Sequence, residues 1–166
     1  MTPDPTFTSR LCLRPFTGAD RAALSTGLND LAVSQWLPRV PYPFTQADLS
    51  VMQSEVPSNW PDLMVIAKDK AAIGAVTTHP HFGFWIARPH WGNGYAREAA
   101  KAALNVALQR NDTVHSGYFA GNSASARILH GLGFTIMSRG RAHCLALGRD
   151  LPDVSLIFTA QGRVAA

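Results

Sequence analysis

The sequence predicts an α+β fold in which helices flank a central mixed, mostly antiparallel β-sheet. Three strand-like segments, at 63–67, 71–78 and 82–87, follow one another with only short turns between them, which favours antiparallel pairing. A strand–helix–strand–helix unit then occupies 82–132, and this alternation makes the sheet mixed. No internal repeat or low-complexity tract divides the 166 residues, so we predict a single domain over 1–166.

The N-terminal part of the chain alternates short elements with loops. Residues 1–9 are predicted to form a loose N-terminal arm, and an alternating strand pattern covers 11–16. The next predicted elements are, in order, a weakly helical stretch at 21–28, a short helical piece carrying Leu31, Val33 and Trp36, a loop with Pro38, Pro41 and Pro43, and a helix from Gln46 to Val56 capped by Thr45.

The second half of the chain has the more regular pattern. Small and apolar residues recur at helical spacing over 96–107, opposite a polar row formed by Arg97, Lys101 and Asn105. The remaining predicted elements are a strand at 113–120, a helix from Asn122 to Leu132 with Gly133 as its left-handed cap, and closing strands at 134–137, 142–147 and 154–159.

The composition is that of a globular chain with a sizeable core. Hydrophobic residues make up 46% and charged residues 16%, which excludes a disordered chain. The formal net charge is +4, but no cluster of Lys and Arg marks a nucleic-acid surface. Cys12 and Cys144 lie in separate apolar stretches and are predicted to be free, buried thiols of a reducing compartment. Without a secretory signal or an apolar run of membrane length, we expect a cytoplasmic protein that has no membrane partner.

A glycine turn between a strand and a helix is the most informative local feature. The strand that ends at Ala87 leads to Gly92 and Gly94, and a helix leaves this turn. The first N–H groups of a helix lack intrahelical partners and, with the helix dipole, form an anion site that glycine keeps open. A P-loop is excluded because its Gly-Lys-Ser/Thr ending is absent. A dinucleotide fingerprint is excluded because Arg97 occupies its last position and no acidic residue follows on the next strand.

The turn resembles the pyrophosphate turn of the GNAT N-acetyltransferases. That pattern is Gln/Arg-x-x-Gly-x-Gly/Ala, and Trp91-Gly92-Asn93-Gly94-Tyr95-Ala96 differs from it only at the first position. Three blocks resemble the RimJ/RimL-like branch of the superfamily, occur in its order and cover most of 10–138. They are Arg10-Leu11-Cys12-Leu13-Arg14-Pro15-Phe16, the string from Gly83-Phe84-Trp85-Ile86 to Glu98-Ala99, and Asn122 to Leu129 followed by Leu132-Gly133-Phe134.

The resemblance implies a GNAT-type sheet whose middle strands splay into a V that holds acetyl-CoA. The strand ending at Ile86 and Ala87 would bond the pantetheine and polarise the thioester carbonyl, and the backbone of 92–96 would hold the pyrophosphate. Relatives often carry a small hydroxyl residue where Arg97 stands, so Arg97 contacts a CoA phosphate or pairs with Glu98 on the helix surface. The implied cofactor-binding residues are Ile86, Ala87, Gly92, Asn93, Gly94, Tyr95, Ala96, Arg97 and Asn122.

Ser125 is the candidate catalytic residue. Many family members protonate the leaving thiolate with a tyrosine, but Leu129 occupies that position here. Ser125 matches a serine of the RimJ/RimL-like branch, and its hydroxyl could donate or relay a proton. Its alternative role is a purely structural one, in which it bonds the helix cap Asn122.

Other candidate groups stay open in the sequence. No general base is identified, although His79 and His81 lie at a turn near the expected acceptor side. A metal site is not expected, because no Cys, Asp or Glu stands at ligand spacing around these histidines and His90. Four aromatic residues near the proline loop either line an acceptor pocket or pack on the sheet: Trp36, Tyr42, Phe44 and Trp60.

The sequence therefore predicts an acetyl-CoA-dependent N-acetyltransferase that needs no metal. The acetyl group would pass to a primary amine, on a small molecule or a protein N-terminus, by direct attack in a ternary complex. The predicted assembly is a monomer or homodimer. The alternative is a non-catalytic CoA-binding module of the same fold, which the missing tyrosine and the unidentified base keep open.

Overall fold

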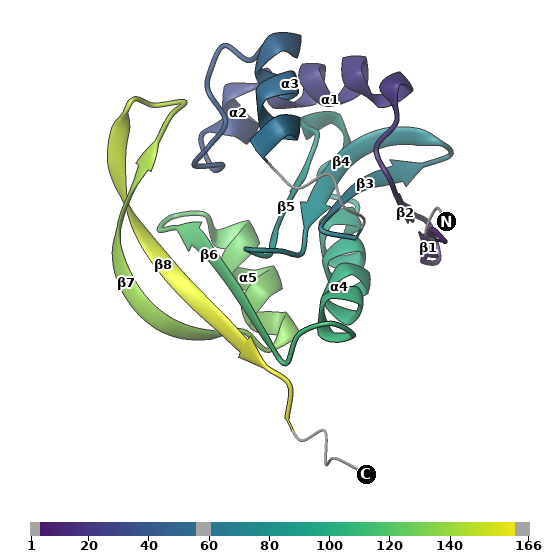
Figure 1. Cartoon of the computed structure of the whole chain (residues 1–166). Helices are drawn as coiled ribbons and strands as arrows, with labels where there is room; N and C mark the ends of the chain where they lie inside the picture. The colour runs from purple at the N-terminus through teal and green to yellow at the C-terminus, as the bar shows by residue number, and fades with distance from the viewer. Residues whose placement is uncertain (1–3, 56–60, 162–166) are drawn as a thin grey trace.

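The strands form two sheets in the computed structural model, which describes residues 4–55 and 61–161 (Figure 1). The first sheet has five antiparallel strands in the order β1-β2-β3-β4-β5, and the second has three in the order β6-β8-β7. Their bounds are β1 Thr6–Phe7, β2 Cys12–Arg14, β3 Leu63–Lys68, β4 Ala71–Thr77, β5 Gly83–Ile86, β6 Thr113–Phe119, β7 Thr135–Cys144 and β8 Arg149–Thr159. The predicted run of three antiparallel strands is confirmed as β3, β4 and β5.

The two sheets touch between the residue before β5 and the middle of β6. Phe82, just before β5, forms a parallel bridge with Ser116 of β6. The Phe82 amide donates to the His115 carbonyl at 2.7 Å, and the Ser116 hydroxyl donates to the Phe82 carbonyl at 2.7 Å. Beyond this bridge no pairing joins β5 to β6 within the described residues. The strands therefore splay apart, which confirms the predicted V, and one edge of β5 stays open.

The first sheet buries a different core on each face. Phe84 packs against the larger cluster and Trp85 against the smaller one, because successive residues of a strand point to opposite faces. The larger cluster is covered by α4 (Tyr95–Leu108) and α5 (Ser123–Leu132), which lie beside the splay (Figure 1). The smaller cluster is covered by α1 (Arg21–Leu28), α3 (Gln46–Glu55) and the loop that follows α2 (Leu31–Ser34).

Small side chains allow α4 to lie close to the sheet. Ala99, Ala100 and Ala103 are each 0% exposed, so the backbone of the helix approaches the strands directly. Alanine also has the highest intrinsic helix propensity, which supports a helix over this alanine-rich stretch. The predicted helix at 96–107 is confirmed as Tyr95–Leu108. Its close packing fixes its N-terminus beside the end of β5, where the glycine turn lies.

The N-terminal segment is more ordered than the predicted loose arm. Thr6 and Phe7 pair with Leu13 and Cys12 as β1 of the first sheet. The Thr8 hydroxyl also donates to the Glu98 carboxylate at 2.6 Å. The segment carries little hydrophobic alternation, so its order comes from contacts with residues far along the chain.

The C-terminal part forms one long hairpin instead of the three predicted closing strands. β7 runs from Thr135 to Cys144, turns through 145–148 and returns as β8. The prediction of a separate strand at 142–147 is therefore wrong: residues 142–144 are the end of β7, and the turn that begins at Leu145 closes at Gly148, which has a left-handed φ of 62°. Most of β7 is exposed, so its backbone pairing with β8 gives no hydrophobic alternation from which to recognise it.

Candidate functional site

The open edge of β5 presents unpaired backbone groups to the splay. The Ala87 amide donates to the Ile73 carbonyl at 2.8 Å, so Ala87 belongs to a hydrogen-bonded pair of the ladder. Hydrogen-bonded and non-hydrogen-bonded pairs alternate along antiparallel strands. Ile86 faces Gly74 in the next pair and therefore points its N–H and C=O away from β4, toward β6. The predicted donor role thus fits Ile86, whereas the N–H of Ala87 is already engaged.

Trp91 fixes the end of this strand. Its indole Nε1 donates to the Ile86 carbonyl at 2.6 Å, and its side chain is nevertheless half-exposed. This contact explains the one departure from the GNAT turn pattern, because a tryptophan at the first position bonds the protein's own strand. It leaves the N–H of Ile86 as the donor at the end of the strand on that edge.

The glycine turn and the start of α4 form a cluster of backbone donors. Gly92 and Gly94 have φ values of 77° and 78°, in the left-handed region that favours glycine. The first intrahelical bond runs from the Glu98 amide to the Gly94 carbonyl at 3.1 Å. The amides of Tyr95, Ala96 and Arg97 precede this bond and so have no intrahelical acceptor. Together with the helix dipole, these donors have the arrangement that the predicted anion site requires.

Asn93 braces the turn with its side chain. Its Nδ2 donates to the carbonyls of His90 and Trp91, each at 3.1 Å. Both bonds close the turn on itself, so the amide side chain acts as a structural element. Because the Asn93 side chain is engaged within the turn, only the backbone of Asn93 remains for a contact with a ligand.

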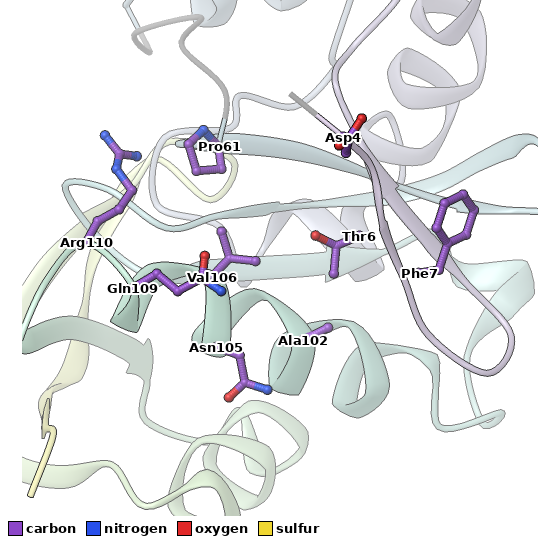
Figure 2. Close-up of a pocket in the computed structure, with 9 residues that line it drawn as sticks. All are labelled: Asp4, Thr6, Phe7, Pro61, Ala102, Asn105, Val106, Gln109 and Arg110. Atoms are coloured by element: carbon purple, nitrogen blue, oxygen red, sulfur yellow. The ribbon is translucent and has the colours of Figure 1, made fainter. Parts of the chain in front are cut away.

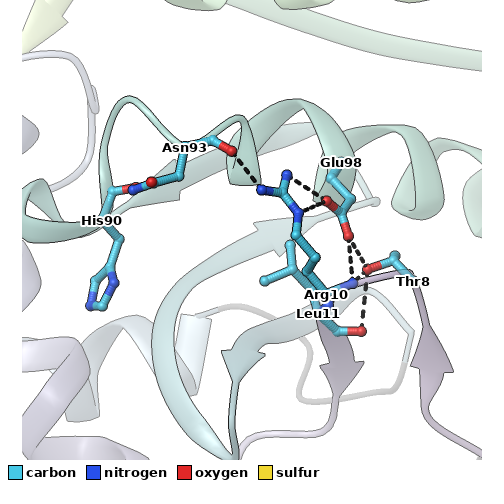
Figure 3. A network of polar contacts seen from close by, with 6 residues as sticks. All are labelled: Thr8, Arg10, Leu11, His90, Asn93 and Glu98. Carbon is cyan, nitrogen blue, oxygen red and sulfur yellow. Dashed lines mark hydrogen bonds and ion pairs between the residues drawn. The ribbon is translucent and has the colours of Figure 1, made fainter.

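Arg10 connects the N-terminal segment to the turn and to α4 (Figure 3). Its Nη1 donates to the Asn93 carbonyl at 2.8 Å, while Nε and Nη2 each lie 2.7 Å from Glu98 Oε2. Partial burial raises the pKa of Glu98, but hydrogen bonds from Thr8 and Arg10 outweigh it and lower that pKa overall. Glu98 therefore pairs with Arg10, and the predicted alternative in which it pairs with Arg97 is wrong. An engaged carboxylate of this kind is also a poor candidate for a general base.

Asn122 and Ser125 lie at the start of α5, on the other side of the splay from β5. The Asn122 Oδ1 accepts a hydrogen bond from the Ser125 amide at 3.2 Å, which confirms the predicted helix cap. The Asn122 Nδ2 donates to the Ser125 hydroxyl oxygen at 3.1 Å. Because that oxygen accepts, the hydroxyl proton of Ser125 is available to another acceptor. Leu129, at the position of the family tyrosine, is 2% exposed within the larger core.

The predicted aromatic cluster divides between two roles. Phe44 is 3% exposed in the smaller core, so it packs on the sheet. The Trp36 ring lies 3.9 Å from the position that a Cβ on Gly121 would take, one residue before Asn122. Trp36 therefore belongs to the wall beside the Asn122–Ser125 pair, whereas Trp60 lies outside the described residues.

Acidic and basic groups also flank the end of β5. Asp30 Oδ1 accepts from the Ala32 amide at 2.9 Å and lies 3.8 Å from Nη1 of Arg88. His79 and His81 are exposed on the turn between β4 and β5.

Among residues 4–55 and 61–161, no three His, Cys, Asp or Glu side chains gather as metal ligands would. No helix in those ranges is both long and apolar enough to span a membrane.

Two surface hollows border α4. One, of about 300 Å³, lies between α4 and α5, and the predicted polar row of Arg97, Lys101 and Asn105 lines one side of it. The other, of about 360 Å³, lies between the N-terminal segment and the outer face of α4 (Figure 2). Of these two hollows, only the first is lined by a residue of the first turn of α4, Arg97.

Comparisons with known proteins identify the fold and the family. A model of the GNAT acetyltransferase domain matches residues 10–135. Over 53 residues the chain is 40% identical to the uncharacterized protein YkkB of Bacillus subtilis (strain 168), a match that spans 31% of each protein.

Solved structures of low sequence identity share the whole fold. A spermidine N-acetyltransferase from Vibrio cholerae, in complex with CoA and spermine, has a TM-score of 0.75 at 17% identity, with 92% of this chain and 96% of that chain covered. Mycobacterium smegmatis RimJ, in complex with CoA-disulfide, has a TM-score of 0.74 at 18% identity, with 94% of this chain and 85% of that chain covered. The family model extends from just before β2 to the start of β7 and includes the glycine turn and the Asn122–Ser125 pair, so this chain belongs to the GNAT acetyltransferase family.

Proposed function

We propose that this chain is an N-acetyltransferase that moves an acetyl group from acetyl-CoA to a primary amine by direct attack in a ternary complex. The observation that carries the proposal is that three groups follow or end the two strands that splay apart. The donors of the glycine turn lie at the start of α4, just after β5, and the N–H of Ile86 lies on the open edge of β5. The Ser125 hydroxyl lies at the start of α5, just after β6, whose parallel bridge to Phe82 puts its end on the same side as the end of β5. An anion site, an oxyanion donor and a proton carrier are what thioester aminolysis needs.

The turn and β5 would bind acetyl-CoA along its length. The amides of the first turn of α4 suit the pyrophosphate, and the open edge of β5 suits the amide groups of the pantetheine. The Ile86 N–H would donate to the thioester carbonyl, whose oxygen gains negative charge as the amine attacks. A backbone donor held in place before the reaction stabilises that charge without further reorganisation.

Ser125 would carry a proton to the leaving sulfur. The amine nitrogen forms a bond to the carbonyl carbon, the carbon–sulfur bond then breaks, and the proton lost by the amine must reach the thiolate. Asn122 holds the Ser125 oxygen through Nδ2, which leaves the hydroxyl proton free to pass to sulfur. A proton from the amine, carried directly or through water, then restores the hydroxyl.

The acceptor determines how much help deprotonation needs. A lysine side chain, with a pKa near 10.4, is almost wholly protonated at neutral pH, whereas an α-amine near 7.7–8.0 is partly neutral. Since no general base is identified among the described residues, an α-amine suits this site well. A protein N-terminus or a small amine with a low pKa is therefore our proposed acceptor class.

The proposal predicts that CoA and acetyl-CoA stabilise the protein without any metal. At a hundredfold excess over Kd, a ligand that binds only the native state adds about 2.7 kcal/mol to the free energy of unfolding. Thermal unfolding with increasing CoA, with EDTA present, measures this effect. No shift at millimolar CoA or acyl-CoA would contradict the cofactor assignment.

The same titration tests Arg97 when dephospho-CoA is included. Arg97 and Lys101 line the hollow between α4 and α5, and Arg97 lies one residue after the last amide of the turn, so these two cations suit the 3′-phosphate of the cofactor. We expect the wild type to bind CoA more tightly than dephospho-CoA, and Arg97→Gln to lose most of this preference. An unchanged preference in Arg97→Gln would show that Arg97 is only a solvated helix residue.

A further inference from the structure

Arg10 joins two parts of the chain that the sequence keeps far apart. It precedes β2, yet its three side-chain nitrogens all contact the turn or the first turn of α4: Nη1 reaches the Asn93 carbonyl, and Nε and Nη2 reach Glu98. Its backbone amide also donates to Glu98 Oε1 at 2.9 Å. The guanidinium carbon lies 4.7 Å from the centre of the Tyr95 ring, within the range of a cation–π contact. Asn93, Tyr95 and Glu98 thus contact this one side chain, and Figure 3 shows its bonds to Asn93 and Glu98.

We propose that Arg10 is a positioning residue that sets the orientation of the anion-binding turn. The Asn93 carbonyl and the Gly94 N–H belong to the same planar trans peptide and so point in opposite directions. Arg10 Nη1 holds the Asn93 carbonyl toward the N-terminal segment of the chain. The Gly94 N–H is therefore directed away from that segment. There it joins the amides of Tyr95 and Ala96. This proposal deepens the proposed function and rests on it.

The shape of arginine suits this task. A planar guanidinium bonds a carboxylate through Nε and Nη2 while Nη1 remains free for another acceptor, which a lysine ammonium does less well. Glu98 anchors the guanidinium, and its own hydrogen bond from Thr8 anchors the carboxylate in turn. A side chain at position 94 would also meet this group, because a Cβ there would lie 3.5 Å from Arg10 Nη2.

The pairing also removes an electrostatic obstacle. Glu98 lies in the first turn of α4, next to the site proposed for a doubly charged pyrophosphate, where a free carboxylate would repel the ligand. Arg10 neutralises that charge. Orientation and neutralisation are separable, because replacing Glu98 with glutamine removes the repulsion without restoring the bond to the Asn93 carbonyl.

The test compares acetyl-CoA with S-acetylpantetheine, which lacks the pyrophosphate, as acetyl donors for Arg10→Gln. We expect Kd for CoA and KM for acetyl-CoA to rise about tenfold, the loss of one net hydrogen bond of the turn, with kcat unchanged. kcat/KM for S-acetylpantetheine should stay at the wild-type value. The double variant Arg10→Gln/Glu98→Gln should retain most of the loss in CoA affinity.

Arg14→Gln is the matched control for folding effects. Arg14, on β2, makes a two-point contact with the Asp20 carboxylate at 2.8 and 2.7 Å, away from the turn. It should lower the Tm while leaving the affinity for CoA unchanged at temperatures where the protein is folded. Arg10→Lys, which keeps the charge, should restore only part of the affinity.

Three results would overturn the inference. They are an unchanged CoA affinity in Arg10→Gln, an equal loss with S-acetylpantetheine, or full recovery in the double variant, which would leave charge neutralisation as the whole effect. A wild type that binds no CoA would instead overturn the proposed function itself, and with it the inference.

Discussion

Replacing Gly94 with valine is expected to weaken CoA binding by about 10²–10⁴-fold, because two charge-assisted hydrogen bonds of the turn, at ~1.5–3 kcal/mol each, would be lost. Gly94 has a φ of 78°, a conformation that costs a β-branched residue about 1–3 kcal/mol. The variant would relieve this strain by moving the turn, and the new side chain would also meet Arg10. Isothermal titration with CoA measures the loss directly.

Gly148→Val provides the control for backbone strain alone. Gly148 also has a left-handed φ, of 62°, and a Cβ there would meet nothing within 4 Å. It lies in the turn between β7 and β8, so its replacement should lower stability to a similar extent with CoA affinity intact. Normal CoA binding by Gly94→Val would mean that the turn is structural and that the anion-site argument is wrong.

Ser125→Ala is expected to lower kcat by about 10²–10⁴-fold if the hydroxyl delivers the proton to the leaving sulfur. KM for acetyl-CoA should change little, because the contact with sulfur strengthens only as the thiolate forms. The helix cap survives this change, since the Asn122 Oδ1 bonds the backbone amide of Ser125 and not its hydroxyl. Steady-state kinetics at saturating acceptor give the comparison.

Ser123→Ala controls for the loss of a hydroxyl at the start of the same helix. Ser123 is the first residue of α5 and is exposed, so its variant should keep both kcat and stability. A thiol has a pKa near 8.5 and leaves partly without help, so a loss of only about tenfold would indicate that Ser125 positions the cofactor. If Ser125→Ala had an unchanged kcat and a lowered Tm, the role of Ser125 would be structural only.

Local patterns predicted the parts of the site that a short stretch of chain determines. The glycine turn follows from two glycines between a strand and an alanine-rich helix, and the cap follows from Asn122 before a helical pattern. Both depend on hydrogen bonds within a few residues, which the order of residue types reveals. The apolar runs of β3 and β4 and the short turns that join β3, β4 and β5 likewise identified the sheet.

Contacts between distant residues could not be predicted in this way. Arg10 and Glu98 are 88 residues apart along the chain, and nothing in the residues around either of them indicates the other as its partner. The choice between Ile86 and Ala87 as the donor on the open edge depends on the register with β4, which a one-residue shift would reverse. The role of Trp91 depends on the hydrogen bond from its indole to the Ile86 carbonyl. The sequence does not reveal this bond, so Trp91 could be recognised only as the residue that differs from the GNAT motif.

The β7–β8 hairpin shows a different limit. Its first strand is exposed on both faces for most of its length, so the chain can carry charged residues such as Arg139 and Arg141 there without loss of pairing. Backbone hydrogen bonds to β8 hold this strand in place, and such bonds do not require any periodic pattern of hydrophobic side chains. Its tip is fixed by the Leu145 amide, which donates to the Pro38 carbonyl at 3.2 Å.

Turnover of acetyl-CoA with a panel of amines tests the central claim most directly. The purified protein is incubated with acetyl-CoA and N-terminal peptides, amino-acid amides or polyamines, while free thiol and acetylated amine are both quantified. We predict that at least one amine yields CoA thiol and acetylated product in equal amounts, at a rate that depends on the amine. Thiol release that is the same with and without amine, or CoA binding without turnover across the panel, would contradict the account and leave a CoA-binding module of the GNAT fold.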